Sequence, residues 1–364
     1  MVGGHLLLPR LFLQISYSYF RITMNKVFFI ILISHQLIFS QDLNDLLFGT
    51  DSSLDLVSWN IEWFPKNNTT SAYVLEILTN LEADIYALQE IEDTTLLKNI
   101  VSNIPDYDCY FKSSYYGGLA YVYNTNTIQV NSKYEIFTSS PYWNAFPRSP
   151  QVLDFTFLGD DYIIINNHFK CCGDGVLNSN NSNDEENRRL QAITYLKQFL
   201  DDDFLNKNVV LLGDLNDNLT DDVENNVFQN FIDDNNNYQF ADMQIAQGSS
   251  LDWSYPSWPS HLDHILISDE LFEDFQNPNS LVSVIRIDDY MGGWDNYDNN
   301  VSDHRPVGIK LDFNAVNFNP ELVNHKKRVV KVVNILGADL NINYSGLIIQ
   351  FFDDRSVEKK YILK

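Results

Sequence analysis

Short apolar segments recur through the middle of this 364-residue chain and alternate with longer segments of helical periodicity. Short apolar runs between polar residues are typical of buried β-strands, and apolar residues three and four apart are typical of amphipathic helices. Helices are expected at 71–81, with Ser71 as the N-cap, and at 188–200. Strands are expected at 54–60, 83–90, 118–123, 152–158, 161–167, 208–212, 262–267 and 307–311. This order predicts one large α/β domain from residue 54 to residue 313.

Most of these strands share a second feature, which is a carboxylate, amide or imidazole side chain at or near one end. Asn and Asp often follow a strand because the turn requires them, and this explains any single case. It explains the whole set poorly, so we expect a polar site where the strands end. The residues concerned are Asn60, Glu90, His168, Asp214, Asn216, Asp263, Asp303 and His304.

Asp303 and His304 are neighbours in the loop 302–306, directly before the last of these strands. Pro306 ends regular structure and stiffens the loop, so the pair is expected at the mouth of a strand. A carboxylate binds a hard metal ion, and an imidazole transfers protons near neutral pH. For these two residues alone, a surface pair without a chemical role is the alternative.

The formal charge of −25, from 49 acidic and 24 basic residues, limits what the surface can bind. Such a surface repels polyanions at long range and offers no footprint for stable binding to nucleic acid or anionic membranes. A metal-dependent enzyme acting on phosphate esters remains compatible with this charge, because a bound cation inverts the potential locally.

Residues 24–40 have the pattern of a secretory signal peptide, with a positive start, an apolar run at 27–33 and a cleavage region. A membrane anchor is the alternative, but the run is short and is interrupted at 34–36, so no stable membrane insertion is expected. Residues 1–23 fit no part of the signal and are expected to be an extension from a mis-assigned start.

Cys109, Cys171 and Cys172 are the only cysteines, which suits an exported protein with at most one disulfide. The spacing contains no Cys-x-x-Cys pair, so a zinc knuckle is not expected. A bond from Cys109 to one of the other two and a bond between the adjacent pair both remain open.

Six short motifs follow one another along the chain: Trp59-Asn60-Ile61-Glu62, Leu88-Gln89-Glu90, Asn167-His168-Phe169-Lys170, Gly213-Asp214-Leu215-Asn216, Leu262-Asp263-His264-Ile265 and Ser302-Asp303-His304-Arg305-Pro306. In this order they resemble the motifs of the deoxyribonuclease I-like endonuclease/exonuclease/phosphatase superfamily, over residues 54–313. The resemblance implies a four-layer sandwich of the α/β (α+β) class. Two packed, mainly antiparallel β-sheets would have helices outside them and the site at the strand ends between them.

The resemblance implies a metal-dependent hydrolase of phosphate esters, and the side chains agree with it. Glu90, Asp303 and Asn60 offer the oxygen ligands that Mg²⁺ prefers, with Mn²⁺ or Ca²⁺ as alternatives. Such an ion stabilises charge on the phosphate and on the leaving oxygen. Glu62 shares a strand face with Asn60, and a structural role for it is equally open.

Five residues are expected to carry the catalytic chemistry. His304 is the expected general base, which takes a proton from the attacking water, and Asp263 fixes its tautomer. Asp214 and Asn216 are expected to orient the nucleophile and to hydrogen-bond a phosphoryl oxygen. His168 resembles the second histidine of the family, a donor to the phosphate or a proton source for the leaving group.

Other side chains are expected to bind substrate. Arg148 resembles the family arginine that steadies phosphate, with an ordinary surface arginine as the alternative, and Lys170 is expected to assist it. Trp253, Tyr255 and Trp258 precede Asp263 and are expected either to stack on a base or to pack beneath their loop.

One departure from the resemblance concerns the support of His168. In deoxyribonuclease I a glutamate orients the corresponding histidine, whereas the stretch 113–118 contains no acid. This leaves room for the wider group of phosphoesterases. The segment 168–173 resembles that of secreted bacterial members, in which the cysteines would brace the loop behind His168.

Beyond a polar linker at 314–325, residues 326–364 are basic at both ends and strand-like. They resemble the C-terminal sorting domain of the Bacteroidetes type IX secretion system, a small β-domain that the export machinery recognises. A trailing hairpin of the catalytic domain is the alternative.

The sequence therefore predicts a secreted phosphodiesterase, an endonuclease acting on extracellular DNA or RNA, monomeric and located outside the cell or at its surface. One alternative is a sphingomyelinase-like or inositol-phosphate phosphoesterase on the same scaffold. Another is a catalytically inactive surface-binding module, which the complete set of site residues disfavours.

Overall fold

The computed structural model of the chain describes residues 41–112, 118–313, 329–334, 346–352 and 357–362. The chain divides into two compact units, Met1–Phe313 and Asn314–Lys364. The predicted extension (1–23), signal peptide (24–40) and linker (314–325) lie outside the described residues, so they stay predictions. Within the described ranges, no helix is both long and apolar enough to cross a bilayer.

The larger unit contains two six-stranded sheets. The first has the order β11-β12-β1-β2-β4-β3, and only its β1–β2 pair is parallel. Its strands are β1 (Ser53–Phe64), β2 (Ile85–Ile91), β3 (Tyr107–Tyr110), β4 (Gly118–Asn124), β11 (Leu281–Val284) and β12 (Val307–Asp312).

The second sheet has the order β5-β6-β7-β8-β10-β9, and only its β7–β8 pair is parallel. Its strands are β5 (Gln129–Glu135), β6 (Gln151–Phe157), β7 (Asp160–His168), β8 (Asn208–Asp214), β9 (Tyr238–Phe240) and β10 (Asp263–Ser268). Both sheets are thus mainly antiparallel, as predicted.

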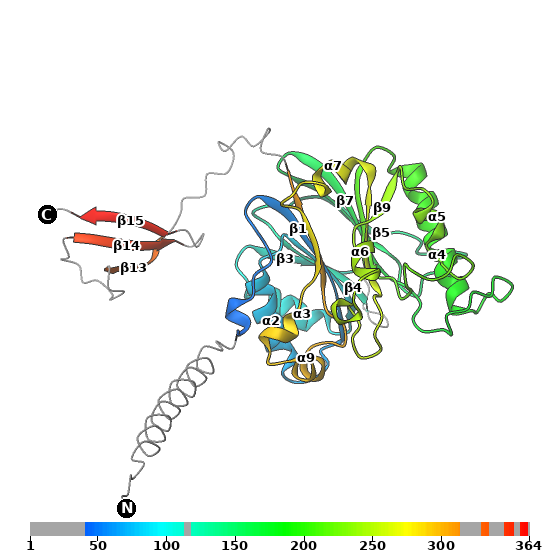
Figure 1. Cartoon of the computed structure of the whole chain (residues 1–364), viewed down its shortest axis with the longest axis horizontal. Coiled ribbons are helices and arrows are strands. Elements are labelled where there is room, and N and C mark those ends of the chain that lie inside the picture. Colours follow the sequence, from blue (N-terminus) through cyan, green and yellow to red (C-terminus); the bar gives the residue numbers. More distant parts are fainter. Residues whose placement is uncertain (1–40, 113–117, 314–328, 335–345, 353–356, 363–364) are drawn as a thin grey trace, which may run out of the picture. The chain divides into compact units, whose positions relative to one another are not determined.

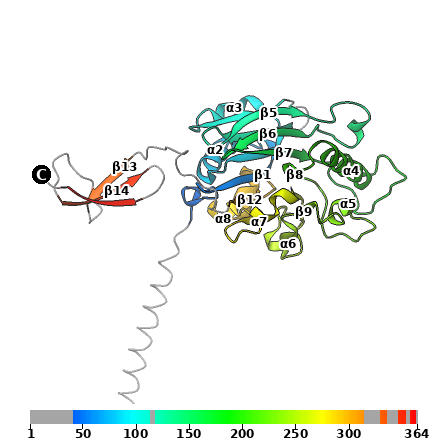
Figure 2. The ribbon, with the colours of Figure 1, turned by 90° about the horizontal axis from the view of Figure 1, so that it is seen from above.

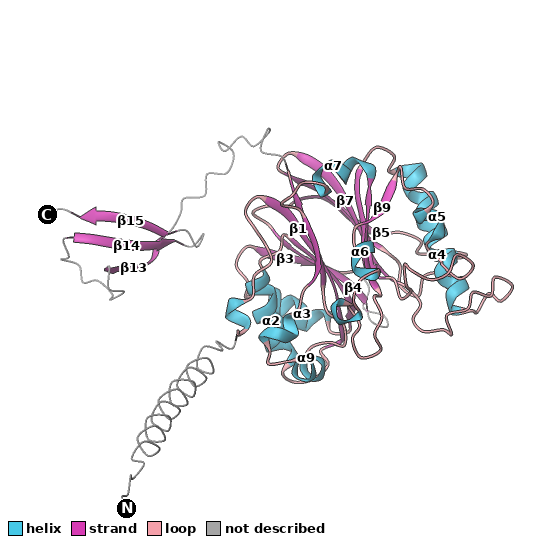
Figure 3. Cartoon of the chain, viewed as in Figure 1, coloured by secondary structure: helices cyan, strands magenta, loops and turns pink. Residues whose placement is uncertain are grey.

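Helices lie outside both sheets (Figure 3). α2 (Thr70–Leu81), α3 (Thr94–Val101), α8 (Ile287–Tyr290) and α9 (Trp294–Asn300) bury side chains with the first sheet. α4 (Glu185–Asp203), α5 (Gln229–Ile232) and α6 (Met243–Ala246) do so with the second. The remaining short elements are α7 (Phe272–Phe275), η1 (Leu43–Asp45), η2 (Tyr142–Asn144), η3 (Ser250–Asp252) and η4 (Asp269–Leu271).

The alternation of side chains along the central strands explains why four layers form. Val57 packs into the core beneath α2 and α3, whereas its neighbour Leu56 packs between the two sheets against residues such as Ile164. A third core lies between the second sheet and α4. Strands with two apolar faces must be covered on both, and the predicted sandwich is confirmed (Figures 1 and 2).

Both predicted helices form, but their starts differ from the prediction. α2 begins at Thr70, and its N-cap residue Thr69 makes no side-chain capping bond, so the predicted cap at Ser71 is wrong. α4 begins at Glu185, inside the expected polar loop, because the Asp184 side chain accepts a hydrogen bond from the Asn187 backbone N–H.

The smaller unit contains one antiparallel sheet of order β13-β14-β15. Its strands are β13 (Val329–Asn334), β14 (Gly346–Phe352) and β15 (Val357–Ile362). A small β-structure after residue 313 agrees with the prediction of a C-terminal β tail.

Two buried carboxylates lie near the N-terminal ends of the parallel strands β1 and β2. The Asp55 backbone N–H donates to Asp84 Oδ2 (2.9 Å), and the Thr127 hydroxyl donates to Asp84 Oδ1 (2.5 Å). Burial raises the pKa of Asp84 to about 7 and that of Asp55 to about 6. The folded protein therefore retains protons that the unfolded chain releases from about pH 4 upward.

We expect these carboxyl groups to lower the free energy of unfolding as the pH rises from about 4 to about 7. Each pKa unit corresponds to about 1.4 kcal/mol. Asp84→Asn cannot titrate, so its stability relative to the wild type should increase across this range and then level off. Urea unfolding of both proteins at several pH values measures the difference, and a difference independent of pH would contradict the expectation.

Candidate active site

Side chains from both sheets meet at one end of the sandwich. The parallel pair β1–β2 places Asn60 opposite Gln89, and the parallel pair β7–β8 places His168 opposite Asp214. The Asn60 amide joins the sheets, because Nδ2 donates to Glu90 Oε1 (3.2 Å) and to Asp214 Oδ2 (2.9 Å). The strand ends are therefore brought together as predicted.

Asp263 and His304 form a buried pair. Asp263 begins β10, and its Oδ2 lies 2.8 Å from His304 Nδ1. Burial alone lowers the pKa of the imidazole, but the carboxylates of Asp263 and Asp214 outweigh it and raise the pKa to about 10. These carboxylates stabilise the imidazolium that forms when His304 accepts a proton, and a cation at the predicted ligands Glu90 and Asp303 would lower the pKa toward the range in which Nε2 is unprotonated.

Asp214 Oδ2 lies at the centre of the polar cluster. It is 3.4 Å from His168 Nε2 and 3.9 Å from His304 Nε2, in addition to its bond from Asn60. Burial raises the pKa of Asp214 to about 7. The Asn216 backbone N–H donates to Asp214 Oδ1 (3.1 Å), so the predicted pair lies in one turn.

His168 is buried at the end of β7, with Nε2 directed at Asp214 and 3.8 Å from Glu90 Oε1. Burial and the nearby Arg148 and His304 hold its pKa well below the usual range, so the imidazole is neutral. Its Nδ1 is buried without a hydrogen-bond partner among the described residues. The stretch 113–117, where deoxyribonuclease I carries the supporting acid, lies outside them.

Glu90 is held in an uncommon backbone conformation. Its φ is 61°, and the pairing of β2 with both neighbours is irregular around it. Glu90 Oε2 accepts the Trp63 backbone N–H (3.0 Å), and Trp63 itself has a φ of 51°. Left-handed backbone at non-glycine residues costs about 1 to 3 kcal/mol and is common at functional sites.

Asp303 lies beside Glu90, and the two carboxylates repel each other. Burial and the charge of Glu90 raise the pKa of Asp303 and outweigh the opposing charges of His304 and Lys66. The Asp303 backbone N–H donates to Glu62 Oε2 (3.0 Å), and the Glu62 backbone N–H donates to Asn60 Oδ1 (2.9 Å). Glu62 is therefore hydrogen-bonded to Asp303 and Asn60, two of the predicted ligands, as a structural role for it would require.

The predicted ligands Glu90, Asp303 and Asn60 fit a hard divalent cation. They offer carboxylate and amide oxygens, and a cation would relieve the repulsion between the two acids. Asp214, Asp263 and His304 also lie close enough to share a metal ion. In that group the Nδ1 of His304 is already bonded to Asp263, which matches a base and its orienting carboxylate.

The two basic residues predicted to bind substrate, Arg148 and Lys170, differ in what surrounds them. The Arg148 guanidinium is near the cluster, since the charges of Glu90 and Asp214 act on it. Burial lowers its pKa, and these two charges partly oppose that effect. The Lys170 ammonium instead contacts the Cys171 carbonyl (2.8 Å) and Glu185 (3.8 Å). The contacts given for Lys170 are thus with its own loop and with the start of α4, and none of them is with the polar cluster.

The loop behind His168 is not braced by cysteines, contrary to prediction. Cys109, Cys171 and Cys172 are free thiols, with 2.8 Å between the last two sulfur atoms. The buried Arg189 holds the loop instead, because its Nη1 donates to the carbonyls of Lys170 (2.8 Å) and Cys172 (2.7 Å). The guanidinium of a buried arginine presents several N–H donors in a fixed geometry, which the exposed thiols of Cys171 and Cys172 do not.

The aromatic residues before Asp263 differ in their surroundings, and the predicted stacking on a base stays a prediction. Trp253 is half-buried, and its indole N–H donates to the Ile245 carbonyl (3.0 Å). The Tyr255 ring lies 4.8 Å from the His304 ring, and Trp258 is 78% exposed. Trp253 therefore packs, Tyr255 covers the histidine, and Trp258 is open to solvent.

Sequence reasoning missed the residues that support the site from behind. The Tyr297 hydroxyl donates to the His304 carbonyl (2.6 Å), and the Ser302 hydroxyl donates to the Asn60 carbonyl (2.7 Å). Gln89 Nε2 donates to Asn166 Oδ1 (2.8 Å) across the two sheets. These partners are up to 242 positions apart in sequence, so no local spacing reveals them.

Several solved structures share this fold. TDP2 from D. rerio, complexed with a single-strand DNA product, is 14% identical, with a TM-score of 0.55 over 72% of this chain and 100% of that one. The human nocturnin catalytic domain with a bound sulfate anion is 17% identical, with a TM-score of 0.52 over 71% and 93%. An endonuclease/exonuclease/phosphatase from Bacteroides vulgatus is 12% identical, with a TM-score of 0.51 over 72% and 100%.

At these identities the likeness establishes the fold alone. No curated protein matches the chain. Residues 57–304, however, match the Endonuclease/Exonuclease/phosphatase family, and this segment extends from β1 to His304. It therefore includes every side chain of the polar cluster described above. The chain belongs to the Endonuclease/Exonuclease/phosphatase family and is a phosphoester-hydrolysing enzyme.

Proposed function

We propose that the protein is a divalent-metal-dependent phosphodiesterase that hydrolyses nucleic acid. The observation that carries the proposal is the Asp263–His304 pair, whose free imidazole nitrogen faces Asp214 at 3.9 Å beside the carboxylates of Glu90 and Asp303. A base, an orienting acid and a hard-cation site at one place are the parts that metal-assisted phosphate hydrolysis requires.

Each side chain then has a defined task. His304 Nε2 takes a proton from the attacking water while Asp263 holds Nδ1. Asp214 and Asn216 orient that water, and the neutral His168 donates a hydrogen bond to the phosphate through Nε2. A cation held by Glu90, Asp303 and Asn60, most suitably Mg²⁺, would supply charge stabilisation at the phosphate. Members of the family depend on divalent metals.

Arg148 supplies the remaining positive charge on the phosphate. Its guanidinium lies within electrostatic reach of Glu90 and Asp214. Because the chain carries a net charge of −25, capture of a polyanion must depend on such local charge and on contacts with the bases. Affinity for nucleic acid should therefore be modest and should decrease with salt.

Two aromatic side chains favour a nucleic acid over other phosphoesters. Trp63 is 53% exposed although its backbone N–H is fixed on Glu90, and Tyr255 covers His304. Aromatic rings beside a scissile phosphate suit unpaired bases, which stack on such surfaces. The fold relative TDP2 was solved with a single-strand DNA product, and single-stranded DNA is the first substrate to test.

Trp63→Ala should weaken the binding of single-stranded oligonucleotides and raise KM by about 10-fold, because one stacked base is worth about 1 to 3 kcal/mol. The backbone N–H that holds Glu90 is retained, so kcat should change little. KM measured with intact and with abasic oligonucleotides checks this, since the effect should disappear without bases. An equal effect on both substrates would contradict a stacking role.

Incubation of the purified protein with single-stranded DNA, duplex DNA, RNA, sphingomyelin and inositol phosphates, with Mg²⁺ or with a chelator, tests the proposed function. We expect magnesium-dependent cleavage of nucleic acid. Cleavage of a lipid or an inositol phosphate instead would replace the substrate class, and cleavage of none would favour the inactive binding module.

We also propose that the protein is exported through the signal at 24–40 and the sorting domain at 326–364. Deletion of 314–364 should leave hydrolysis unchanged and retain the enzyme in the periplasm, because the catalytic unit ends at Phe313. Fractionation and activity measurements on the truncated protein check this. Aggregation or loss of activity would show that the tail completes the catalytic unit.

A further inference from the structure

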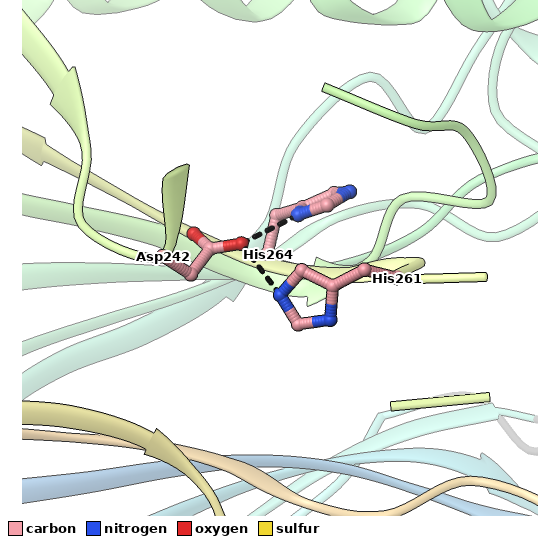
Figure 4. Close-up of side chains that lie close together, drawn as sticks. All are labelled: Asp242, His261 and His264. Carbon is pink, nitrogen blue, oxygen red and sulfur yellow. Dashed lines mark hydrogen bonds and ion pairs between the residues drawn. The ribbon is translucent and has the colours of Figure 1, made fainter. Parts of the chain in front are cut away.

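A second polar cluster is buried behind the catalytic pair and has no part in the mechanism above. It consists of Asp242, His261 and His264, which are at most 2% exposed (Figure 4). His264 Nδ1 lies 2.6 Å and His261 Nε2 lies 3.0 Å from the same oxygen, Asp242 Oδ2. His264 directly follows Asp263 in β10, so the cluster is one residue from the acid that orients His304.

The hydrogen-bond partners of the two His264 nitrogens define the charge of this imidazole. His264 Nε2 faces the Asp217 carbonyl (2.8 Å) and Nδ1 faces Asp242, so both nitrogens carry protons and the ring is an imidazolium. Although burial opposes this charge, the Asp242 carboxylate outweighs it and raises the pKa of His264. Asp242 Oδ1 accepts the Ile265 backbone N–H (2.9 Å).

His261 contacts both the ion pair and a neighbouring loop. Its Nδ1 accepts the Ser254 backbone N–H (3.3 Å), and its Nε2 lies 3.0 Å from Asp242 Oδ2. Asp242, His261 and His264 are close enough to hold a metal ion, but three of the four imidazole nitrogens already have hydrogen-bond partners among the described residues. The cluster is therefore a buried ion pair with His261 in contact with it.

Ser254 connects this cluster to the active site. It is fully buried, and its Oγ accepts the backbone N–H groups of Leu262 (3.2 Å) and Asp263 (3.3 Å). Its carbonyl accepts the Arg305 backbone N–H (2.7 Å). One residue thus holds the backbone of Asp263 and the backbone next to His304, which are 41 positions apart.

The backbone position matters because the Asp263 carboxylate has few other restraints. Its Oδ2 contacts His304, while its Oδ1 is buried without a hydrogen-bond partner among the described residues. A shift of the β10 backbone would therefore move the carboxylate, because no hydrogen bond to Oδ1 from a described residue holds it in place. A displacement of about 1 Å at a catalytic group costs up to about 10²-fold in rate.

We propose that His261 and Ser254 are positioning residues: His261 holds Ser254, and Ser254 fixes both backbone segments of the Asp263–His304 pair. This rests on the proposed function, because it assigns the network to the same general base. The link that transmits position is the hydrogen bond from the Ser254 N–H to His261 Nδ1.

Two substitutions of His261 separate this role from simple stability. In His261→Asn the side-chain oxygen replaces Nδ1 as the acceptor for Ser254 and the contact with Asp242 is lost. In His261→Gln the amide nitrogen replaces Nε2 as the donor to Asp242 and the acceptor for Ser254 is lost. We expect kcat to fall about 10-fold in the Gln variant, with KM nearly unchanged, and much less in the Asn variant.

The full-length variants are compared by kcat and KM on a single-stranded oligonucleotide with Mg²⁺, by Tm, and by the low-field NMR signal of the His304 Nδ1 proton. That signal should shift in the Gln variant and not in the Asn variant, whatever their Tm values. Equal losses of kcat in both, in proportion to the fall in Tm, would overturn the proposal, as would an unchanged signal and rate in the Gln variant.

Ser254→Ala provides an independent test if a His261 variant does not fold. It removes the acceptor for the N–H groups of Leu262 and Asp263 but keeps the carbonyl bond to Arg305. It should lower kcat about 10-fold and shift the same proton signal; an unchanged rate and signal would overturn the proposal. If the wild type is inactive but the signals shift as expected, the proposed function fails while the positioning network stands.

Discussion

His304→Ala is expected to lower kcat by a factor of about 10² to 10⁴, the range in which a lost general base usually falls. His304 Nε2 is the imidazole nitrogen that Asp263 leaves open, and it faces Asp214 inside the cluster. The carbonyl of His304 is held by Tyr297 through the backbone, so alanine preserves that contact and the fold. Single-turnover rates and Mg²⁺ titration check that the loss is in kcat and that metal affinity is intact.

Glu90→Gln is the variant to compare with His304→Ala, because it changes a predicted metal ligand and not the predicted base. It retains an oxygen for the Trp63 N–H but removes a negative charge from the predicted ligand set. We expect weaker metal binding, with a rate that is partly restored by added Mg²⁺. If Mg²⁺ restored His304→Ala and not Glu90→Gln, the assigned roles of base and metal ligand would be reversed.

Gly213→Ala is expected to cost about 3 to 5 kcal/mol in the free energy of unfolding and most of the activity. Gly213 has a φ of +141°, and a Cβ there would lie 2.0 Å from the backbone oxygen of Asn167 on the neighbouring strand β7. Because this neighbour is backbone, β7 and β8 must separate. The separation displaces His168 and Asp214, which follow these two residues directly.

Gly159→Ala is the control. Gly159 also has a positive φ, +100°, but a Cβ there meets nothing within 4 Å, and the residue lies just before β7, at the end opposite His168. It should lose only about 1 to 2 kcal/mol from backbone strain and keep its kcat. Urea unfolding and kcat for both variants measure the contrast, and equal losses would show that the strand contact at Gly213 is unimportant.

The buried central strands were predictable because a strand covered on both faces is rich in apolar residues. β1, β2, β7 and β8 are buried along most of their length, and each contains several apolar residues that mark it in the sequence. Four strands of the larger unit were not predicted, and they are the edge strands of its two six-stranded sheets: β3, β5, β9 and β11. An edge strand such as β5 is largely exposed, so it carries no strong pattern.

The helix α3 was missed for a related reason. It is only eight residues long, Thr94–Val101, and buries just Leu97, Ile100 and Val101 against the first sheet. Its start is set by the Asp93 side chain, which accepts the Leu96 backbone N–H (2.8 Å). A short helix with one narrow apolar face becomes stable through packing that local sequence does not report.

By itself the sequence determined which residues end the strands and the chemistry they offer, so Asn60, Glu90, His168, Asp214, Asp263 and His304 could be named in advance. Their types follow from the chemistry of the site, and each could be recognised because it lies at or near the end of a strand. Only the tertiary structure decided what holds them in place. Ser254, Arg189, Tyr297 and Glu62 act through hydrogen bonds to other segments. Such bonds depend on how two sheets are packed, and a sequence pattern contains no record of that packing.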